Sequence, residues 1–207
     1  IGANSTFRLS GDTEISSASD LTLGNLELGG NKLSLDFASV NNATFILPNT
    51  LAMDTAGSVI ETRGSNLTLA NALQINMGSI TSTGGTLSFA GGLTLAPYGS
   101  IDVTDSTLSV SQVLDLSFGT FTGSTSSVLD LQAATTLFSS DEGVLFGSLT
   151  TNGNVLTLGS VSTHLKLNDP LSLDGIALET GAGSLTLLDT LSLSNSAALN
   201  STGGTIT

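Results

Sequence analysis

The sequence repeats itself about every twenty residues, and this period constrains the fold more than any single residue does. The tripeptides Gly57-Ser-Val59, Gly78-Ser-Ile80 and Gly99-Ser-Ile101 recur at equal intervals, and Gly119-Thr-Phe121 continues the series with an interval one residue shorter. Short apolar-x-apolar stretches, separated by Gly, Ser, Thr, Asn and Asp, fill each period. A period of this kind is typical of a solenoid, in which each coil contacts only its neighbours.

Within each period, apolar and polar residues alternate, which is the pattern of a strand with one buried face. In Leu21-Thr-Leu23, Leu26-Glu-Leu28 and Leu33-Ser-Leu35 we expect the leucines to point inward and Thr22, Glu27 and Ser34 to point outward. Three such stretches per coil predict a triangular cross-section. The residues that we expect in the core include Leu67, Leu69, Leu73, Ile75, Ile80, Leu93, Leu95 and Ile101. Glycines at the corners are expected to supply positive φ.

The whole chain, 1–207, is predicted to form one rod, with less regular coils over 1–42. The chain begins with Ile1 and shows no initiator methionine, so we expect a fragment of a longer repetitive polypeptide. Neither end carries an obvious polar cap, and uncapped strand edges recruit other strands. We therefore expect further coils of the same chain, or end-to-end self-association, at the ends.

Composition excludes several classes of function. The formal net charge is −13, with 17 acidic residues against four Lys and Arg, so nucleic-acid binding is not expected. Cysteine is absent, which excludes disulfides and cysteine-ligated metals. No stretch approaches the ~18 uncharged apolar residues of a membrane helix, so we expect no membrane insertion of this segment. Aromatic residues make up only 4%, which predicts a core of Leu, Ile, Val and Ala.

The Leu-Thr-Leu phrases and Thr-Gly-Gly-Thr-Leu, found at 83–87, lie in coils rich in Ser, Thr, Gly and Asn. In these features the chain resembles the right-handed parallel β-helices of large bacterial surface proteins, namely autotransporter passenger domains and filamentous-haemagglutinin-type adhesins. The fold prediction is accordingly an all-β, right-handed parallel β-helix (β-solenoid) with about twenty residues and three short strands per coil and almost no α-helix. The resemblance implies a secreted or surface-anchored, non-enzymatic stalk or adhesive rod, and a glycan or protein of a host surface or matrix as its partner.

An enzyme is the alternative, because parallel β-helices also host polysaccharide lyases and hydrolases. Such chemistry needs a basic residue beside carboxylates, or two or three clustered aspartates. Arg63 and Lys166 are the basic candidates if the coils place them on one face. The closest acidic pairs are Asp102 with Asp105, Asp141 with Glu142 and Asp169 with Asp174. Each pair lies in a turn-rich segment, where aspartate has an ordinary structural role, so we expect no catalytic residues.

A passive binding face for ice, Ca²⁺ or glycan is a further alternative, which would show as one outward stripe of uniform residue type. Asp102, Asp105, Asp169 and Asp174 are weak Ca²⁺ candidates, because turn carboxylates are hard oxygen ligands, and no other cofactor is expected. His164, the single histidine, is expected to be a solvated strand residue. An ice-binding face would need Thr-x-Thr in every coil, and only Thr81-Ser-Thr83 and Thr205-Ile-Thr207 approach it. Glycosylation sequons begin at Asn4, Asn42, Asn66 and Asn200.

Overall fold

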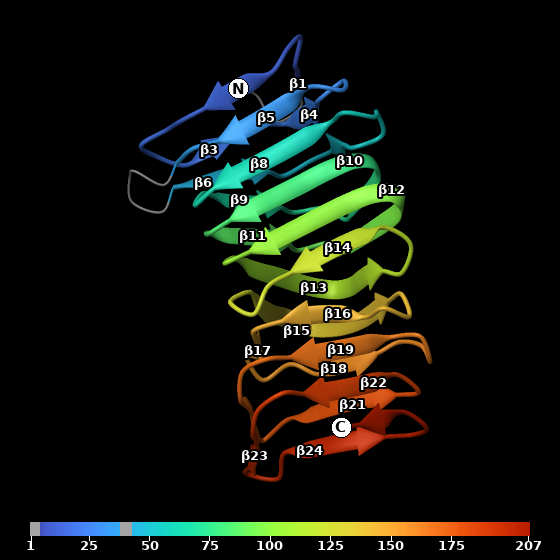
Figure 1. Ribbon diagram of the computed structural model, residues 1–207. Helices are drawn as coiled ribbons and strands as arrows, with labels where there is room; N and C mark the ends of the chain where they lie inside the picture. Colours follow the sequence, from blue (N-terminus) through green and yellow to red (C-terminus); the bar gives the residue numbers. More distant parts are fainter. Residues whose placement is uncertain (1–4, 38–42) are drawn as a thin grey trace.

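The computed structural model describes residues 5–37 and 43–207, and in them the chain is a parallel β-solenoid of about nine turns without a helix (Figure 1). Each turn takes about 21 residues. Every strand pair is parallel. In Figure 1 the near strands run to the left and the far strands to the right as the chain descends, which makes the winding right-handed. The predicted fold class is confirmed.

The coils stack into three faces, numbered in the order in which the chain visits them. Face 1 contains β2 (Thr13–Ile15), β5 (Lys32–Leu35), β8 (Val59–Arg63), the second parts of β10 (Leu73–Thr83) and β12 (Leu93–Thr104), β14 (Thr120–Gly123), β16 (Val144–Phe146), β19 (His164–Leu167), β22 (Ser184–Leu187) and β25 (Thr205–Ile206).

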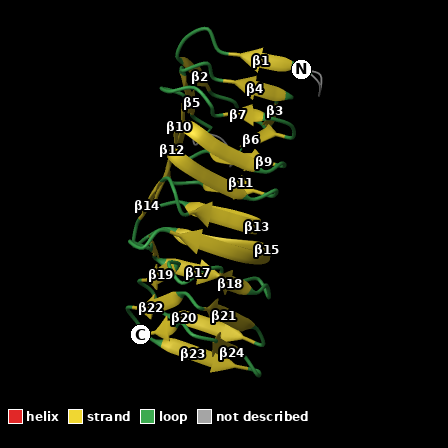
Figure 2. Ribbon diagram, turned by 90° about the vertical axis from the view of Figure 1, so that its right-hand side faces the viewer, coloured by secondary structure: helices red, strands yellow, loops and turns green. Residues whose placement is uncertain are grey.

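Face 2 contains β3 (Leu21–Thr22), β6 (Thr44–Leu47), β9 (Asn66–Leu69), β11 (Thr86–Phe89), the first parts of β13 (Thr107–Leu116) and β15 (Val128–Ser139), β17 (Ser148–Thr150), β20 (Leu171–Asp174) and β23 (Leu191–Ser194). Face 3, which is toward the viewer in Figure 2, contains β1 (Thr6–Arg8), β4 (Asn25–Glu27), β7 (Leu51–Ala52), the remaining parts of β10, β12, β13 and β15, and β18 (Leu156–Leu158), β21 (Ala177–Gly181) and β24 (Ala198–Ser201).

Four strands are longer than the short strands that the sequence predicts, because they bend around a corner without ending. β10 and β12 pass from face 3 to face 1 at the right of Figure 1, and their pairing shifts register between Ile75 and Met77. β13 and β15 pass from face 2 to face 3, with a shift between Val110 and Gln112. Gln112 has a φ of 69°. Such bulges let a ladder continue while the strand changes direction.

The interior is aliphatic, as predicted. All eight expected core residues are at most 3% exposed, as the values for Leu73 (3%), Leu95 (0%) and Ile101 (1%) illustrate. Successive coils align them in columns: Ile80 pairs with Ile60 on one side and Ile101 on the other. The core also holds four fully buried phenylalanines, which the expectation of Leu, Ile, Val and Ala omitted: Phe37, Phe45, Phe89 and Phe146.

A chain of buried hydroxyl groups runs inside the corner between faces 1 and 2. Thr62 Oγ1 donates to Ser82 Oγ at 2.8 Å, and Ser82 Oγ lies 2.9 Å from Ser106 Oγ on the next coil. These three side chains are at most 2% exposed. Ser82 also bonds the Gly84 carbonyl at 3.2 Å. Each of these hydroxyl groups therefore has a hydrogen-bond partner on a neighbouring coil. The side chains thus connect successive coils in addition to the backbone hydrogen bonds between strands.

The expected positive φ is found at corner glycines such as Gly57 and Gly84, but it does not explain every glycine stacked at the corner between faces 3 and 1. Gly78 has a φ of +104°, but Gly99 and Gly119 lie outside the positive-φ region. A Cβ on Gly99 would lie 2.1 Å from the carbonyl oxygen of Ile75, and one on Gly119 would lie 2.5 Å from that of Gly99. At these two positions the close approach of successive coils, and not the backbone conformation, requires glycine.

The first described coils differ in length from the later ones but occupy the same columns. The coil that leads from Leu33 to its partner Ile60 is longer than the coil that leads from Leu73 to its partner Leu93. At the other end, Leu191, Leu193 and Ile206 continue the buried columns of Leu171, Leu173 and Leu185, yet their exposed fractions are 39%, 47% and 39%. Thus the last described coil presents core residues at its open edge.

Candidate functional site

The corner between faces 3 and 1 carries an exposed apolar ladder, by which we mean Met77, Tyr98 and Phe118. Met77 pairs with Tyr98, and each of the three directly precedes one of the stacked glycines, so they occupy consecutive coils. Their exposed fractions are 37%, 76% and 69%. Tyr98 and Phe118 are the exposed aromatic side chains of the described residues; the other phenylalanines there are buried or half-buried. The sequence pattern alone did not reveal this ladder.

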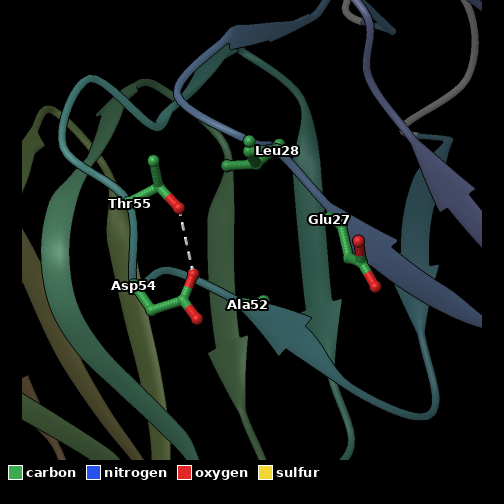
Figure 3. Close-up of a pocket in the computed structure, with 6 residues that line it drawn as sticks. Glu27, Leu28, Ala52, Asp54 and Thr55 are labelled. Carbon is green, nitrogen blue, oxygen red and sulfur yellow. Dashed lines mark hydrogen bonds between the residues drawn. The ribbon is translucent and has the colours of Figure 1, made fainter.

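A polar hollow lies on the N-terminal side of the ladder (Figure 3). Its volume is about 340 Å³, and it is lined by Glu27, Leu28, Gly29, Ala52, Asp54 and Thr55. The backbone N–H of Met77 donates to the carbonyl of Met53 at 2.9 Å, which places Met77 one coil below Asp54. Asp54 Oδ1 accepts a hydrogen bond from Thr55 Oγ1 at 3.3 Å. Glu27 is held by Arg8, whose Nε donates to Glu27 Oε2 at 2.6 Å.

A second polar hollow, of about 370 Å³, lies on the C-terminal side of the ladder. It is lined by Ser117, Ser139, Ser140, Asp141, Ser160 and Ser162. Ser117 is the residue before Phe118, so the hollow begins where the ladder ends. A smaller hollow of about 110 Å³, on the other side of the 140–142 turn, includes Phe121 and Glu142. The predicted acidic pair Asp141 and Glu142 thus flanks the ladder, and neither carboxylate takes a hydrogen bond from any residue that the structure describes.

The basic candidates Arg63 and Lys166 lie on one face but far apart. Arg63 ends β8 and Lys166 belongs to β19, five coils later on face 1, or about 24 Å along the axis. Arg63 Nη2 contacts Glu61 Oε2 at 2.7 Å, and Lys32 Nζ contacts the same oxygen at 2.7 Å. Lys32, foremost, and then Arg63 hold the pKa of Glu61 below its ordinary value. Within the described ranges Lys166 forms no ion pair, so neither base faces two carboxylates.

His164 differs from the expected solvated residue. It points outward from β19, since Leu165 and Leu167 are buried, but it is half-buried against the next coil. Its Nδ1 hydrogen-bonds Ser184 Oγ, and its backbone N–H donates to Ser139 Oγ at 2.9 Å. The next strand covers the imidazole because coils lie only about 4.8 Å apart. His164 therefore links coils.

The calcium candidates are held by separate partners. Asp102 Oδ1 accepts from Thr104 Oγ1 at 2.8 Å, whereas Asp105 bonds Ser126 on the next coil. Asp169 and Asp174 lie before and at the end of β20, about 16 Å apart along an extended chain. Hydrogen bonds from Ser194 (2.8 Å) and then Asn195 (2.6 Å) hold the pKa of Asp174 below its usual range. The described residues contain no cluster of three metal-ligating side chains. Calcium binding stays a prediction.

The remaining candidates are the Thr-x-Thr pairs and the sequons. Thr81 and Thr83 point outward from β10 on either side of buried Ser82, and their partners on the next coil are Asp102 and Thr104. The next coil therefore carries Asp-x-Thr in place of Thr-x-Thr, so the threonine pair is not repeated along face 1. Of the four sequons, Asn4 and Asn42 lie outside the described residues. Asn66 Oδ1 accepts the Thr86 N–H at 2.9 Å, and Asn200 Nδ2 donates to Glu179 at 2.8 Å.

Comparison with known proteins gives no family: no family model, no curated protein and no solved structure matches the chain. None of the described elements is a helix of the length and apolar character needed to cross a membrane. Functional inference therefore rests on the residues themselves.

Proposed function

We propose that this chain is a non-enzymatic structural and adhesive segment of a secreted or cell-surface bacterial protein. The observation that supports this proposal best is the continuous stacking of about nine coils, which gives a rod about 43 Å long. A solenoid gains length by adding coils to existing columns, since each coil contacts only its neighbours. Such a body suits a stalk that holds a binding surface away from the cell.

The C-terminal edge supports a role in a longer assembly. β23, β24 and β25 each pair on one side only among the described strands, and Leu193 and Ile206 are 47% and 39% exposed there. A strand edge with apolar core residues favours pairing with the coil of a second copy. We propose no catalytic role, because Arg63 contacts a single carboxylate that Lys32 shares.

Two measurements on the purified chain test the proposal. Sedimentation velocity from low to high concentration measures end-to-end assembly, and the variant with both L193K and I206K should lose it, because two ammonium groups would be buried in the contact. Retention of chain-coated beads on immobilised matrix glycans and proteins measures adhesion. We expect at least one of the two. A chain that stays monomeric at every concentration, and whose beads are retained on no surface, overturns the proposal.

A further inference from the structure

We propose that the corner between faces 3 and 1 is a binding strip for a neutral polysaccharide chain, with the apolar ladder as its central platform. This inference rests on the proposed adhesive function and names its ligand class. The strip comprises the ladder and the two large polar hollows beside it. From the coil of Gly29 to that of Ser162 it spans six coil steps, or about 29 Å, which suits an extended chain of several sugar rings.

The exposed aromatic rings are gathered at this corner. The chain has nine Phe and Tyr residues in all, and the two that are exposed in the described ranges lie at one corner on adjacent coils. Core packing does not explain them, since Tyr98 is 76% and Phe118 69% exposed. Exposed aromatic rings lose contact with apolar neighbours, and their grouping indicates a surface that meets a partner. The coil stacking sets the rungs about 4.8 Å apart along a straight line.

Polar groups lie at both ends of the apolar ladder. A sugar ring offers an apolar C–H face and a rim of hydroxyl groups, so its site needs an apolar platform beside hydrogen-bonding groups. Five serines and Asp141 line the C-terminal hollow, and the Oγ atoms of two of these serines, Ser139 and Ser160, already bond neighbouring residues. Asp54 and Thr55 line the N-terminal hollow. Carboxylates accept strong, charge-assisted hydrogen bonds from ligand hydroxyls, and Asp141 has no partner within the described part of the chain.

The negative charge of the strip favours a neutral glycan. The strip presents Glu27, Asp54 and Asp141, Glu142 lines the smaller hollow beside it, and the chain as a whole carries −13. The nearby Arg8 is already paired with Glu27. An anionic polysaccharide would therefore be repelled, and neither hollow offers a cation to bind its carboxylate or sulfate groups.

The chain supplies its own reporter for the test. Tyr98 is the only tyrosine and tryptophan is absent, so tyrosine emission arises from the proposed platform alone. The probes are soluble oligosaccharides of β-1,4-linked glucose, xylose and mannose, with polygalacturonate as the anionic comparison. We expect a saturable change of Tyr98 emission with at least one neutral probe and none with polygalacturonate. If no neutral probe changes the emission, or if polygalacturonate binds as tightly, the proposal is wrong.

Variants separate a ring contact from an indirect effect. F118A keeps the reporter and should weaken binding at least about fivefold, the low end for loss of a planar ring stacked on an aromatic side chain. D141N should also weaken it, whereas V113A, which trims an apolar side chain that is 42% exposed at another corner, should not. Equal affinities of wild type and F118A contradict the proposal. The melting temperature of F118A should be that of wild type, because the ring is exposed.

The remaining outcomes distinguish this inference from the proposed function. If coated beads of F118A and D141N adhere as wild-type beads do, the chain is adhesive and the strip is not its binding site. If F118A instead abolishes self-association in sedimentation velocity, the ladder is a contact with a second copy, and the glycan proposal fails. If wild-type beads adhere nowhere and the chain never assembles, the proposed function fails with it.

Discussion

Alanine at Gly99 should destabilise the solenoid by about 2–3 kcal/mol, although alanine is usually a mild substitution. The new Cβ would lie 2.1 Å from the carbonyl oxygen of Ile75, whereas real Cβ contacts are essentially never below 3.0 Å. The two coils must therefore separate by nearly 1 Å at this rung. A hydrogen bond of about 2.9 Å between the two strands would then be longer than the usual N···O distance. Each lost bond costs about 1 kcal/mol net.

Two glycines with different surroundings provide matched controls. Gly153 has a φ of +78°, and a Cβ added there would meet no atom within 4 Å, so G153A should cost about 1–2 kcal/mol through backbone strain alone. Gly11 has neither a positive φ nor a neighbour within 4 Å, so G11A should change stability by at most about 0.5 kcal/mol. Urea denaturation of the three variants measures the loss of stability in each. If G99A is no less stable than G11A, the coils do not approach as closely as described.

Three further predictions concern the polar contacts and the open edge. S82A should cost about 1–3 kcal/mol in urea denaturation, because it removes the buried partner of Thr62 and Ser106, whereas S88A should cost little; equal effects would contradict a role for the hydroxyl chain. The lowered pKa of Glu61 means that its ion pairs stabilise the fold above the ordinary pKa of glutamate, and that this contribution is lost as the pH falls through the folded value. E61Q should therefore be less stable than wild type by at most about 1 kcal/mol at pH 7, and the difference should shrink as the pH falls through the folded pKa of Glu61; a difference that does not depend on pH would refute this. L193K alone should reduce self-association at high protein concentration, which sedimentation velocity measures. It should not lower the melting temperature in thermal denaturation, because Leu193 is 47% exposed at the edge.

The alternation of residues predicted the interior well. Inward positions such as Leu67 and Ile80 follow from a period of two, and the repeat length predicted the stacking. The same phase also pointed Ser82 inward, since it lies two residues after Ile80. Composition argued for an aliphatic core, however, and the buried hydroxyls became understandable only when the register brought Thr62, Ser82 and Ser106 together.

The candidate site could not be predicted in the same way, because alternation fails at a corner. The register of β10 shifts between Ile75 and Met77. The alternation of inward and outward residues on face 3 therefore does not predict which residues point inward on face 1. A usable signal was nevertheless present: Met77, Tyr98 and Phe118 each precede a glycine of the repeat that aligned the coils. For Gly99, sequence indicated the corner but not the reason for glycine, which depends on the distance to the next coil.

The account depends on aliphatic side chains that line the interior of stacked coils, and L95D tests it most directly. Leu95 is 0% exposed, so an aspartate there would bury an unpaired carboxylate and should cost about 3–5 kcal/mol, with loss of neighbouring coils. S100D, at an outward position of the same strand between Ser79 and Thr120, is the control and should cost less than about 1 kcal/mol. The account predicts a large loss of stability in L95D alone. Equal denaturation midpoints for L95D, S100D and wild type would contradict it.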